Sequence, residues 1–123
     1  MPQKILIVED EPLLREMYQQ KFEQADLLVV TAEDGEQGLE MIKKEQPDFV
    51  LLDILLPKES GIDLLKKVRQ DEQLAGTKVV AFSNFDDPHT KGVAFGLGIS
   101  DYLIKTNFTP QEVLDKIKKH LQG

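Results

Sequence analysis

Cysteine is absent from this chain of 123 residues, which excludes a disulfide framework, a thiolate metal site and a cysteine nucleophile. Long apolar runs are missing too. The first apolar run, Ile5–Val8, is too short for the apolar region of a signal peptide. No run approaches the roughly 18 apolar residues of a membrane span. These absences favour a cytoplasmic protein with no membrane partner.

Basic residues are the minority, with 15 lysines and arginines against 22 acidic residues and a net charge of −7. Direct binding of nucleic acid needs a basic surface, so any effect on DNA would pass through another protein. The length suits one domain with a real core. Because no repeat, low-complexity tract or linker interrupts it, we expect a single domain over residues 1–123 and no output domain in this chain.

Short apolar runs alternate with stretches of helical spacing. The runs are typical of strands buried on both faces of a parallel sheet, and they are Ile5–Val8, Leu27–Val30, Phe49–Leu52, Val79–Phe82 and Tyr102–Ile104. Apolar stripes predict five helices, marked by Leu14, Met17, Tyr18 and Phe22; Leu39 and Ile42; Leu64, Leu65 and Val68; Val93, Ala94 and Leu97; and Val113, Leu114, Ile117 and Leu121. The alternation predicts a three-layer α/β fold with helices on both faces of a parallel sheet.

Two of the predicted helices have informative local sequences. Thr109, Pro110 and Glu112 form a capping box that predicts the start of the last helix. In the fourth helix, Gly92 and Gly96 each weaken the helix by about 1 kcal/mol relative to alanine. We therefore expect the fourth helix to be the least stable.

Polar residues stand where the predicted strands end. Glu9 and Asp10 follow the first strand, Asp53 the third, Ser83 the fourth and Lys105 the fifth. Side chains at the carboxyl ends of parallel strands face the crevice where open α/β sheets bind ligands. Clustered carboxylates need a cation, and their oxygens suit Mg²⁺. A carboxylate is an accepted phosphoryl nucleophile, and an ammonium and a hydroxyl can hold the transferred group.

These residues belong to motifs that resemble a bacterial two-component response-regulator receiver domain over essentially the full length of the chain. The motifs are ILIVEDE at residues 5–11, LLDILLP at residues 51–57 with Gly61, VVAFS at residues 79–83 and DYLIK at residues 101–105. The resemblance implies a flavodoxin-like fold, with a five-stranded parallel sheet in the order 2-1-3-4-5 flanked by five helices.

The resemblance also implies the chemistry. Asp53 would accept a phosphoryl group from a phosphohistidine of a sensor histidine kinase or a phosphotransfer protein. Mg²⁺ would be bound by Asp10 and Asp53 directly, by the backbone carbonyl of Leu55 and, through water, by Glu9. Such a domain is not an enzyme in the usual sense, because it catalyses only its own phosphorylation and dephosphorylation.

The remaining roles that the resemblance implies concern the switch. Lys105 would pair with Asp53 or the phosphoryl oxygens, and Ser83 would bond a phosphoryl oxygen. Tyr102 resembles the aromatic switch that turns inward when the hydroxyl moves. The changed surface, around the fourth helix, fifth strand and fifth helix and including Lys91, Phe95 and Tyr102, would bind a downstream protein target or a second copy of the chain.

Some positions depart from the family pattern. Asn84 replaces a small residue after the switch hydroxyl, where it would narrow access to the phosphoacceptor or bond a phosphoryl oxygen. Leu55 and Phe85 are apolar at positions that tune phosphoryl lifetime, and we expect them to shield the acyl phosphate from water. Thr106 stands where proline is usual after Lys105. Because a non-proline cis bond costs about 2.5–4 kcal/mol, we predict a trans Lys105–Thr106 bond and a different loop.

Two alternative functions remain open at this point. A Mg²⁺-dependent aspartyl phosphohydrolase usually carries a second aspartate two residues after its nucleophile, where this chain has Leu55. A flavodoxin-type binder needs a phosphate-binding loop after the first strand, where residues 9–11 are all acidic.

His89 and His120 have no ligand spacing, and we predict that both lie on the surface.

Overall fold

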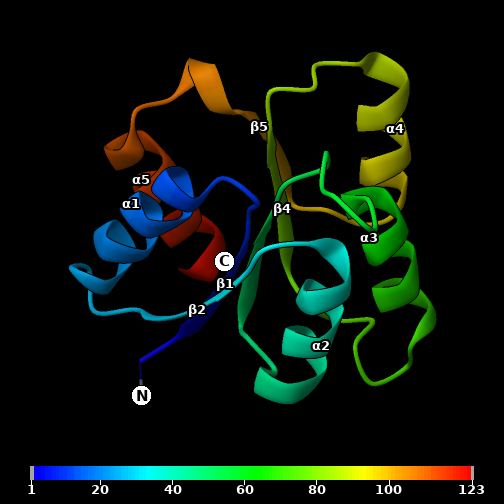
Figure 1. Ribbon diagram of the computed structural model, residues 1–123, viewed down its shortest axis with the longest axis horizontal. Helices are drawn as coiled ribbons and strands as arrows, with labels where there is room; N and C mark the ends of the chain where they lie inside the picture. Colours follow the sequence, from blue (N-terminus) through cyan, green and yellow to red (C-terminus); the bar gives the residue numbers. More distant parts are fainter. Residues whose placement is uncertain (1, 123) are drawn as a thin grey trace.

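Five strands and five α-helices alternate in the computed structural model, which describes residues 2–122 (Figure 1). In chain order they are β1 (Lys4–Val8), α1 (Pro12–Glu23), β2 (Leu28–Ala32), α2 (Gly35–Glu45), β3 (Phe49–Leu52), α3 (Gly61–Gln70), β4 (Val79–Ser83), α4 (Pro88–Gly96), β5 (Asp101–Ile104) and α5 (Pro110–Gln122). A single 3₁₀ turn, η1 (Lys105–Asn107), connects β5 to α5. Each run predicted as a strand is a strand, although β2 begins and ends later than expected.

The strands form one parallel sheet in the order β2-β1-β3-β4-β5. This order confirms the fold that the resemblance implied. Because every strand runs in the same direction, all five carboxyl ends reach the same edge of the sheet. The loops that leave that edge therefore carry the polar residues singled out in the sequence.

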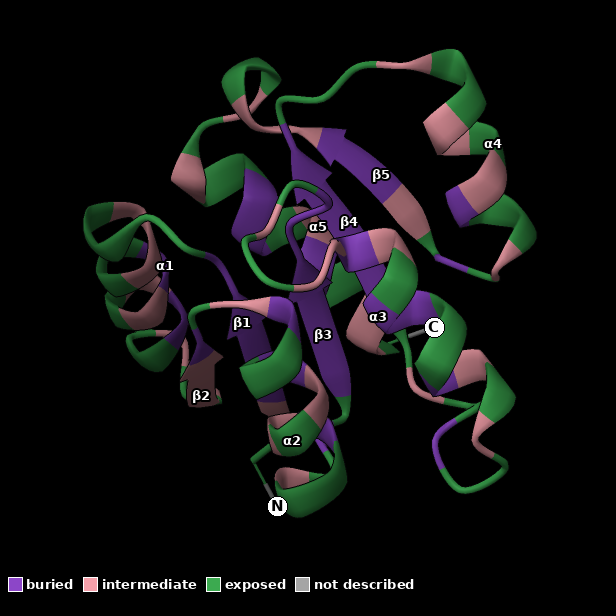
Figure 2. Ribbon diagram, turned by 45° about the vertical axis from the view of Figure 1, so that its right-hand side comes forward, coloured by how far each residue is buried: buried purple, intermediate pink, exposed green. Residues whose placement is uncertain are grey.

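The sheet separates two hydrophobic cores, which lie on opposite faces. Helices α2, α3 and α4 cover one face, where Ile42, Leu64 and Ala94 pack against alternate strand residues such as Val50. Helices α1 and α5 cover the other face, where the core contains Phe22, Phe49 and Ile117. The three layers are visible in Figure 1, and Figure 2 shows the central strands as the most buried part of the chain. Within residues 2–122 no helix is long and apolar enough to cross a membrane.

Two details of the predicted helical stripes are wrong. Met17, expected in the stripe of α1, is 40% exposed, because it lies one position before the buried Tyr18 and at the margin of the stripe. Leu97, expected within the fourth helix, instead follows the last helical residue Gly96 as its C-cap. Leu97 still packs against the core. Its apolar side chain therefore indicated a core contact correctly, although the residue lies outside the helix.

The predicted capping box at the start of α5 is confirmed. The amide of Glu112 donates to Oγ1 of Thr109 at 3.2 Å, and the amide of Thr109 donates to Oε1 of Glu112 at 2.9 Å. Two amides that a helix start leaves unpaired are thus satisfied by side chains. The box fixes where α5 begins, at Pro110, five residues after Lys105.

Candidate functional site

The pairing of β1 with β3 places Glu9 beside Asp53. The last residue pair in this ladder is Val8 with Leu52, so each acidic residue follows directly on its strand. The amide of Asp53 donates to the carbonyl of Val8 at 3.1 Å, which continues the pairing by one bond beyond the ladder. The two carboxylates are therefore positioned by the backbone of two central strands.

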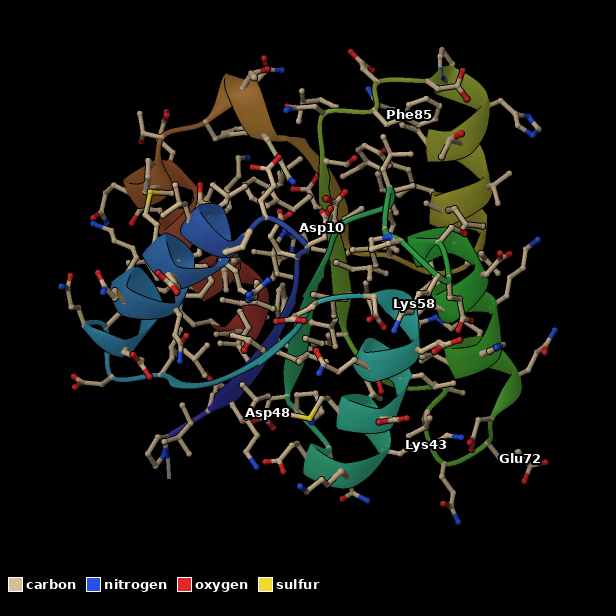
Figure 3. The ribbon with its side chains drawn as sticks, in the orientation of Figure 1. Asp10, Lys43, Asp48, Lys58, Glu72 and Phe85 are labelled. Carbon is tan, nitrogen blue, oxygen red and sulfur yellow. The ribbon has the colours of Figure 1, made fainter. Side chains whose placement is uncertain are left out.

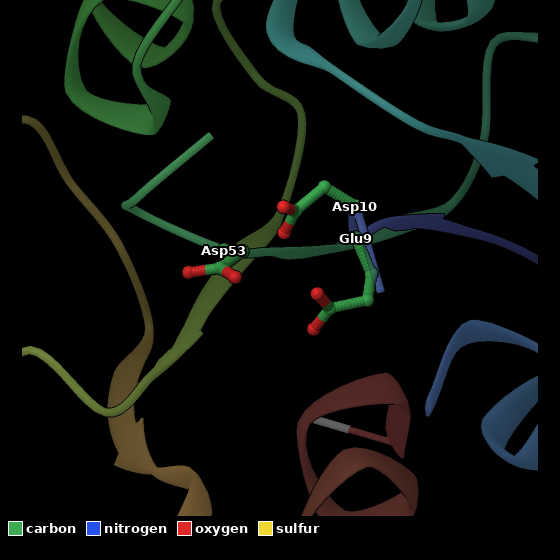
Figure 4. A group of neighbouring side chains, drawn as sticks. All are labelled: Glu9, Asp10 and Asp53. Carbon is green, nitrogen blue, oxygen red and sulfur yellow. The ribbon is translucent and has the colours of Figure 1, made fainter. Parts of the chain in front are cut away.

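Three carboxylates converge at this edge of the sheet. Oxygen atoms of Glu9, Asp10 and Asp53 all lie within 4.8 Å of one another. Figure 4 shows the carboxylates of Asp10 and Glu9 on the same side of Asp53, one above the other, and turned toward it. Glu9 and Asp53 are buried and Asp10 is exposed, so the cluster has a buried base and a solvent-facing side.

Lys105, which directly follows the edge strand β5, supplies a positive charge to the cluster. Its Nζ lies 2.5 Å from Oε1 of Glu9 and 2.9 Å from Oδ2 of Asp53. The contact with Asp53 was expected. The contact with Glu9 was not, because the sequence suggested only a role for Glu9 through water. One ammonium against three carboxylates leaves the cluster with an excess of negative charge.

Burial and hydrogen bonding act in opposite directions on the pKa values of Lys105 and Glu9. Burial opposes the charged form of Lys105, but its hydrogen bonds to Glu9 and Asp53 outweigh burial and raise its pKa above the ordinary value. For Glu9, burial is the larger influence, and it raises the pKa in spite of the bonds from Lys105 and the Glu11 amide. The pKa of each group is therefore raised, by hydrogen bonding for Lys105 and by burial for Glu9.

The Asp53 side chain is held by both of its oxygens. Oδ2 accepts the bond from Lys105, and Oδ1 accepts the amide of Leu55 at 3.1 Å. The start of α3 packs closely behind, since a Cβ on Gly61 would stand 2.3 Å from the carbonyl oxygen of Asp53. Only glycine allows this approach, which explains the place of Gly61 in the motif. The Leu55 side chain is 56% exposed.

Ser83 and Tyr102 lie on the neighbouring strands and meet at the loop after β4. Both are buried, and the Oγ of Ser83 accepts the amide of Phe85 at 3.2 Å. The hydroxyl of Tyr102 donates to the carbonyl of Phe85 at 2.5 Å. The hydroxyl and the aromatic residue predicted as a switch pair are therefore tied to the same residue of one loop.

The partner face predicted from Lys91, Phe95 and Tyr102 is assembled in part. The Nζ of Lys91 lies 5.6 Å from the centre of the Tyr102 ring and also pairs with Asp86. Phe95, one turn further along α4, is 49% exposed. Figure 3 shows Phe85 in the loop that leads into α4, with its ring toward that helix.

The two departures from the family pattern next to the site contact each other. Oδ1 of Asn84 accepts the amide of Thr106 at 3.1 Å. No peptide bond between residues 2 and 122 is cis, so the prediction of a trans Lys105–Thr106 bond is confirmed. A proline at position 106 would have no amide to donate. The amide oxygen of Asn84 is thus committed to the turn after β5.

Some residues of the site had no signal in the sequence. Arg15, on α1, donates through Nη1 to the carbonyl of Glu9 at 2.9 Å and pairs with Glu33 at 3.3 Å. It steadies the backbone that carries Glu9 and Asp10. A basic residue on a helix is usually solvated, and neither its spacing nor its neighbours indicated this contact.

The prediction that both histidines lie on the surface is half wrong. His89 is exposed, as expected. His120 is partly buried at the end of α5, where its ring stacks on Phe49 at 6.4 Å and its Nε2 lies 3.4 Å from Oδ2 of Asp101. Both contacts join α5 to the sheet, so His120 belongs to the packing of the fold and not to the acidic site.

The residues at the site fit a magnesium ion. Its preferred ligands are carboxylate and carbonyl oxygens together with water. The cluster supplies oxygens from Asp10 and Asp53, and its solvent-facing side leaves room for water. Its excess negative charge would be lowered by a divalent cation. A transition metal that prefers imidazole or thiolate finds neither kind of ligand among these three residues.

Comparison with protein-family models matches residues 5–118 to the response regulator receiver domain. Among curated proteins, the chain is 34% identical over 122 residues to the alkaline phosphatase synthesis transcriptional regulatory protein PhoP of Bacillus subtilis, covering 99% of the chain and 50% of that protein. It is 32% identical to the phosphate regulon transcriptional regulatory protein PhoB of Pseudomonas aeruginosa, covering 96% of the chain and 51% of that protein. The chain thus spans about half the length of these curated relatives.

Solved structures agree over a larger share of their own length. A putative response regulator from Chloroflexus aurantiacus superposes with a TM-score of 0.89 at 33% identity, over 100% of both chains. The beryllofluoride-activated receiver domain of RstA from Klebsiella pneumoniae has a TM-score of 0.86 at 32% identity, covering 98% of this chain and 99% of that one.

Proposed function

The chain belongs to the response regulator receiver domain family, and from that premise we propose that Asp53 is the phosphoacceptor of a two-component phosphorelay. The observation that carries the proposal is the position of its carboxylate. It is buried at the edge of the sheet, bonded to Lys105 on one oxygen and to the Leu55 amide on the other, beside Glu9 and Asp10. A nucleophile fixed in this way is prepared for in-line attack.

The proposed transfer forms one bond and breaks another. A carboxylate oxygen of Asp53 attacks the phosphorus of a phosphohistidine on a sensor kinase or phosphotransfer protein. The phosphorus–nitrogen bond then breaks, and its electron pair stays on the imidazole of the donor. Lys105 Nζ would give up its bond to the Asp53 carboxylate and bond the oxygens of the new phosphoryl group. Phosphoryl transfer depends mainly on such positioning and charge neutralisation.

Magnesium is the cofactor that we propose for this step. Asp10 and Asp53 would hold it directly, the backbone carbonyl of Leu55 would be a further ligand, and Glu9 would act through water. When bound, the ion neutralises charge on the phosphoryl oxygens. Arg15 would support it indirectly, because it holds the backbone of the loop that carries Asp10.

The proposed output is a change in the surface around α4, β5 and α5. When the Ser83 hydroxyl turns to a phosphoryl oxygen, its present bond from the Phe85 amide is lost, and the loop that also holds Tyr102 rearranges. The exposed Phe95 and the neighbouring Lys91 would then present a changed face to a downstream protein or a second copy. Since the relatives are named as transcriptional regulators and are about twice as long, any effect on DNA would pass through a separate domain or protein.

A phosphohydrolase acting on external esters is not favoured. The position of its general acid is held by Leu55, whose side chain cannot donate a proton. The domain would instead turn over only its own acyl phosphate. We also propose that Leu55 and Phe85 slow this loss by limiting the approach of water.

The test is incubation of the protein with acetyl phosphate and Mg²⁺. We expect a mass gain of one phosphoryl group per chain, stable in acid and labile in alkali. The gain should be absent in Asp53→Asn and without Mg²⁺, and Asp10→Asn should raise the Mg²⁺ concentration needed for half the maximal rate. A modified Asp53→Asn protein, or continuous phosphate release from added esters, would contradict the proposal.

A further inference from the structure

Two residues that directly follow members of the site are joined by a side-chain hydrogen bond. Asn84 follows Ser83, Thr106 follows Lys105, and the Asn84 Oδ1 accepts the Thr106 amide at 3.1 Å. The bond therefore connects the loop after β4 with the turn after β5. No other bond between residues 2 and 122 links Asn84 to that turn.

The bond lies where regular pairing of these strands has stopped. The β4–β5 ladder ends at the pair Ser83 and Ile104. One residue further on, the chain enters the 3₁₀ turn Lys105–Asn107, which has no side-chain cap of its own. A single 3₁₀ turn is weakly held by its own backbone. The Asn84 side chain extends the connection between the strands by one step, to the level of Lys105.

Lys105 depends on an accurately placed backbone. Its side chain reaches two acceptors on two other strands, Glu9 after β1 and Asp53 after β3. A turn that is free to move would spread the ammonium over positions where it meets only one of them. Misplacement of a charged group by about 1 Å is enough to lower a rate substantially.

From these contacts we infer that Asn84 is a positioning residue for Lys105, acting through the amide of Thr106. This inference rests on the proposed function for its effect on phosphorylation. It predicts that the bond affects the transfer step more than the binding of Mg²⁺, because Lys105 is not a ligand of the ion and the carboxylates are held by β1 and β3. It also gives a physical role to two residues that depart from the family pattern together: the threonine supplies an amide that proline lacks, and the asparagine accepts it.

The first experiment measures the bond without phosphorylation. Amide hydrogen exchange at Thr106 and backbone order parameters of residues 105–107 are compared in the native protein, Asn84→Ala and Asn84→Asp. We expect faster exchange and lower order in Asn84→Ala. Asn84→Asp, which keeps an acceptor oxygen at the same place, should restore both. Unchanged exchange and order in Asn84→Ala would overturn the inference.

The second experiment measures the rate of phosphorylation by acetyl phosphate against Mg²⁺ concentration. For Asn84→Ala we expect a maximal rate roughly three- to tenfold lower, as for the loss of one hydrogen bond. The half-saturating Mg²⁺ concentration should be unchanged. An unchanged rate, or an equal loss in rate and Mg²⁺ binding, would overturn the positioning role. A native protein that takes up no phosphoryl group would instead refute the proposed function, and the exchange data would still decide whether Asn84 holds the turn.

Discussion

The ammonium of Lys105 lies closer to Oε1 of Glu9, at 2.5 Å, than to Oδ2 of the proposed nucleophile Asp53, at 2.9 Å. Glu9 is only 3% exposed, so its charge depends on this contact. The lysine is therefore shared between Glu9, whose buried charge it stabilises, and Asp53, the proposed nucleophile. The stability of the domain should consequently depend on the ionisation of Glu9.

Glu9→Gln should change the pH dependence of stability in the absence of Mg²⁺. Burial raises the pKa of Glu9 in the folded protein. At pH values between the unfolded and the folded pKa, the folded protein therefore holds a proton that the unfolded chain has lost. The free energy of unfolding contributed by this group therefore falls as the pH rises from the unfolded pKa through the folded one. Glutamine does not titrate, so Glu9→Gln does not lose this free energy. The stability of the variant relative to the native protein should therefore rise as the pH increases from the unfolded to the folded pKa of Glu9. Urea unfolding at a series of pH values measures the difference; parallel curves would contradict it.

Glycine-to-alanine changes at two positions should have opposite effects on stability. A Cβ on Gly61 would meet the carbonyl oxygen of Asp53 at 2.3 Å, so Gly61→Ala should destabilise the domain by about 1–3 kcal/mol through overpacking. Gly92 has no atom within 4 Å of such a Cβ. Gly92→Ala should therefore stabilise α4 and the domain by about 0.5–1 kcal/mol. Urea denaturation of the matched pair is the measurement, and equal effects of the same sign would contradict the close packing at Gly61.

Arg69→Met should be among the more destabilising changes away from the site. The Arg69 guanidinium donates to carbonyls of two loops, those of Leu97 at 2.6 Å, Thr77 at 2.7 Å, Ala75 at 3.0 Å and Gly98 at 3.2 Å. Its burial lowers its pKa, and no carboxylate pairs with it among residues 2–122. We expect a loss of about 2–4 kcal/mol, since hydrogen bonds from a charged group are stronger than average.

The control for that change is Arg69→Lys, which keeps the charge but not the planar fork of donors. It should recover only part of the stability, as measured by the urea midpoint. In both variants the folded fraction should still take up a phosphoryl group at Asp53, because Arg69 lies before β4 and β5 and away from the carboxyl edge. Full recovery by lysine would show that charge alone matters.

Thr109→Ala should destabilise α5 by about 1 kcal/mol through loss of the N-cap. Thr109→Ser keeps the hydroxyl and should remain close to the native value. Thermal unfolding followed by circular dichroism compares the two variants. An alanine variant as stable as the serine variant would mean that the Glu112 side chain alone holds the helix start.

Phe85→Ser should shorten the lifetime of the acyl phosphate, because it removes an apolar side chain from the loop beside the site. Leu28→Ser, on the edge strand β2, removes another exposed apolar side chain and should leave the lifetime unchanged. The decay of phosphorylated protein after removal of acetyl phosphate is the measurement. Equal lifetimes in Phe85→Ser and the native protein would reject the shielding role.

Strand order was predictable only through the resemblance to receiver domains. The meeting of polar residues was predictable because the polarity of a parallel sheet gathers strand ends at one edge. Position in the chain was therefore enough to bring Glu9, Asp53, Ser83 and Lys105 together. The bonds within the site were not predictable. Which carboxylate Lys105 prefers depends on distances that periodicity does not encode.

Hydrogen bonds from side chains to the backbone of other segments were also not predictable from the sequence. Asn84, Arg15 and Arg69 are polar residues that usually face solvent, and each instead donates to or accepts from backbone of another segment. Backbone carbonyls are present at every residue and amide N–H groups at every residue except proline, so a sequence contains no pattern that identifies which one a side chain will meet. The prediction for Met17 was wrong for a related reason. An apolar stripe predicts which face of a helix is buried, but not where the buried face ends.

The four bonds of Arg69 also affect the mechanics of the fold. They anchor Leu97 and Gly98, which follow the C-terminal end of α4, to the loop that precedes β4. The opposite end of the helix is reached through the loop of Ser83 and Phe85, whose bonds would be exchanged on phosphorylation. Sliding α4 along its axis would break the bonds to Leu97 and Gly98, whereas rotating it about Leu97 would keep the bond to Leu97. We therefore expect the start of α4 to move further than its end when Ser83 turns to a phosphoryl oxygen, because only the end is held by Arg69.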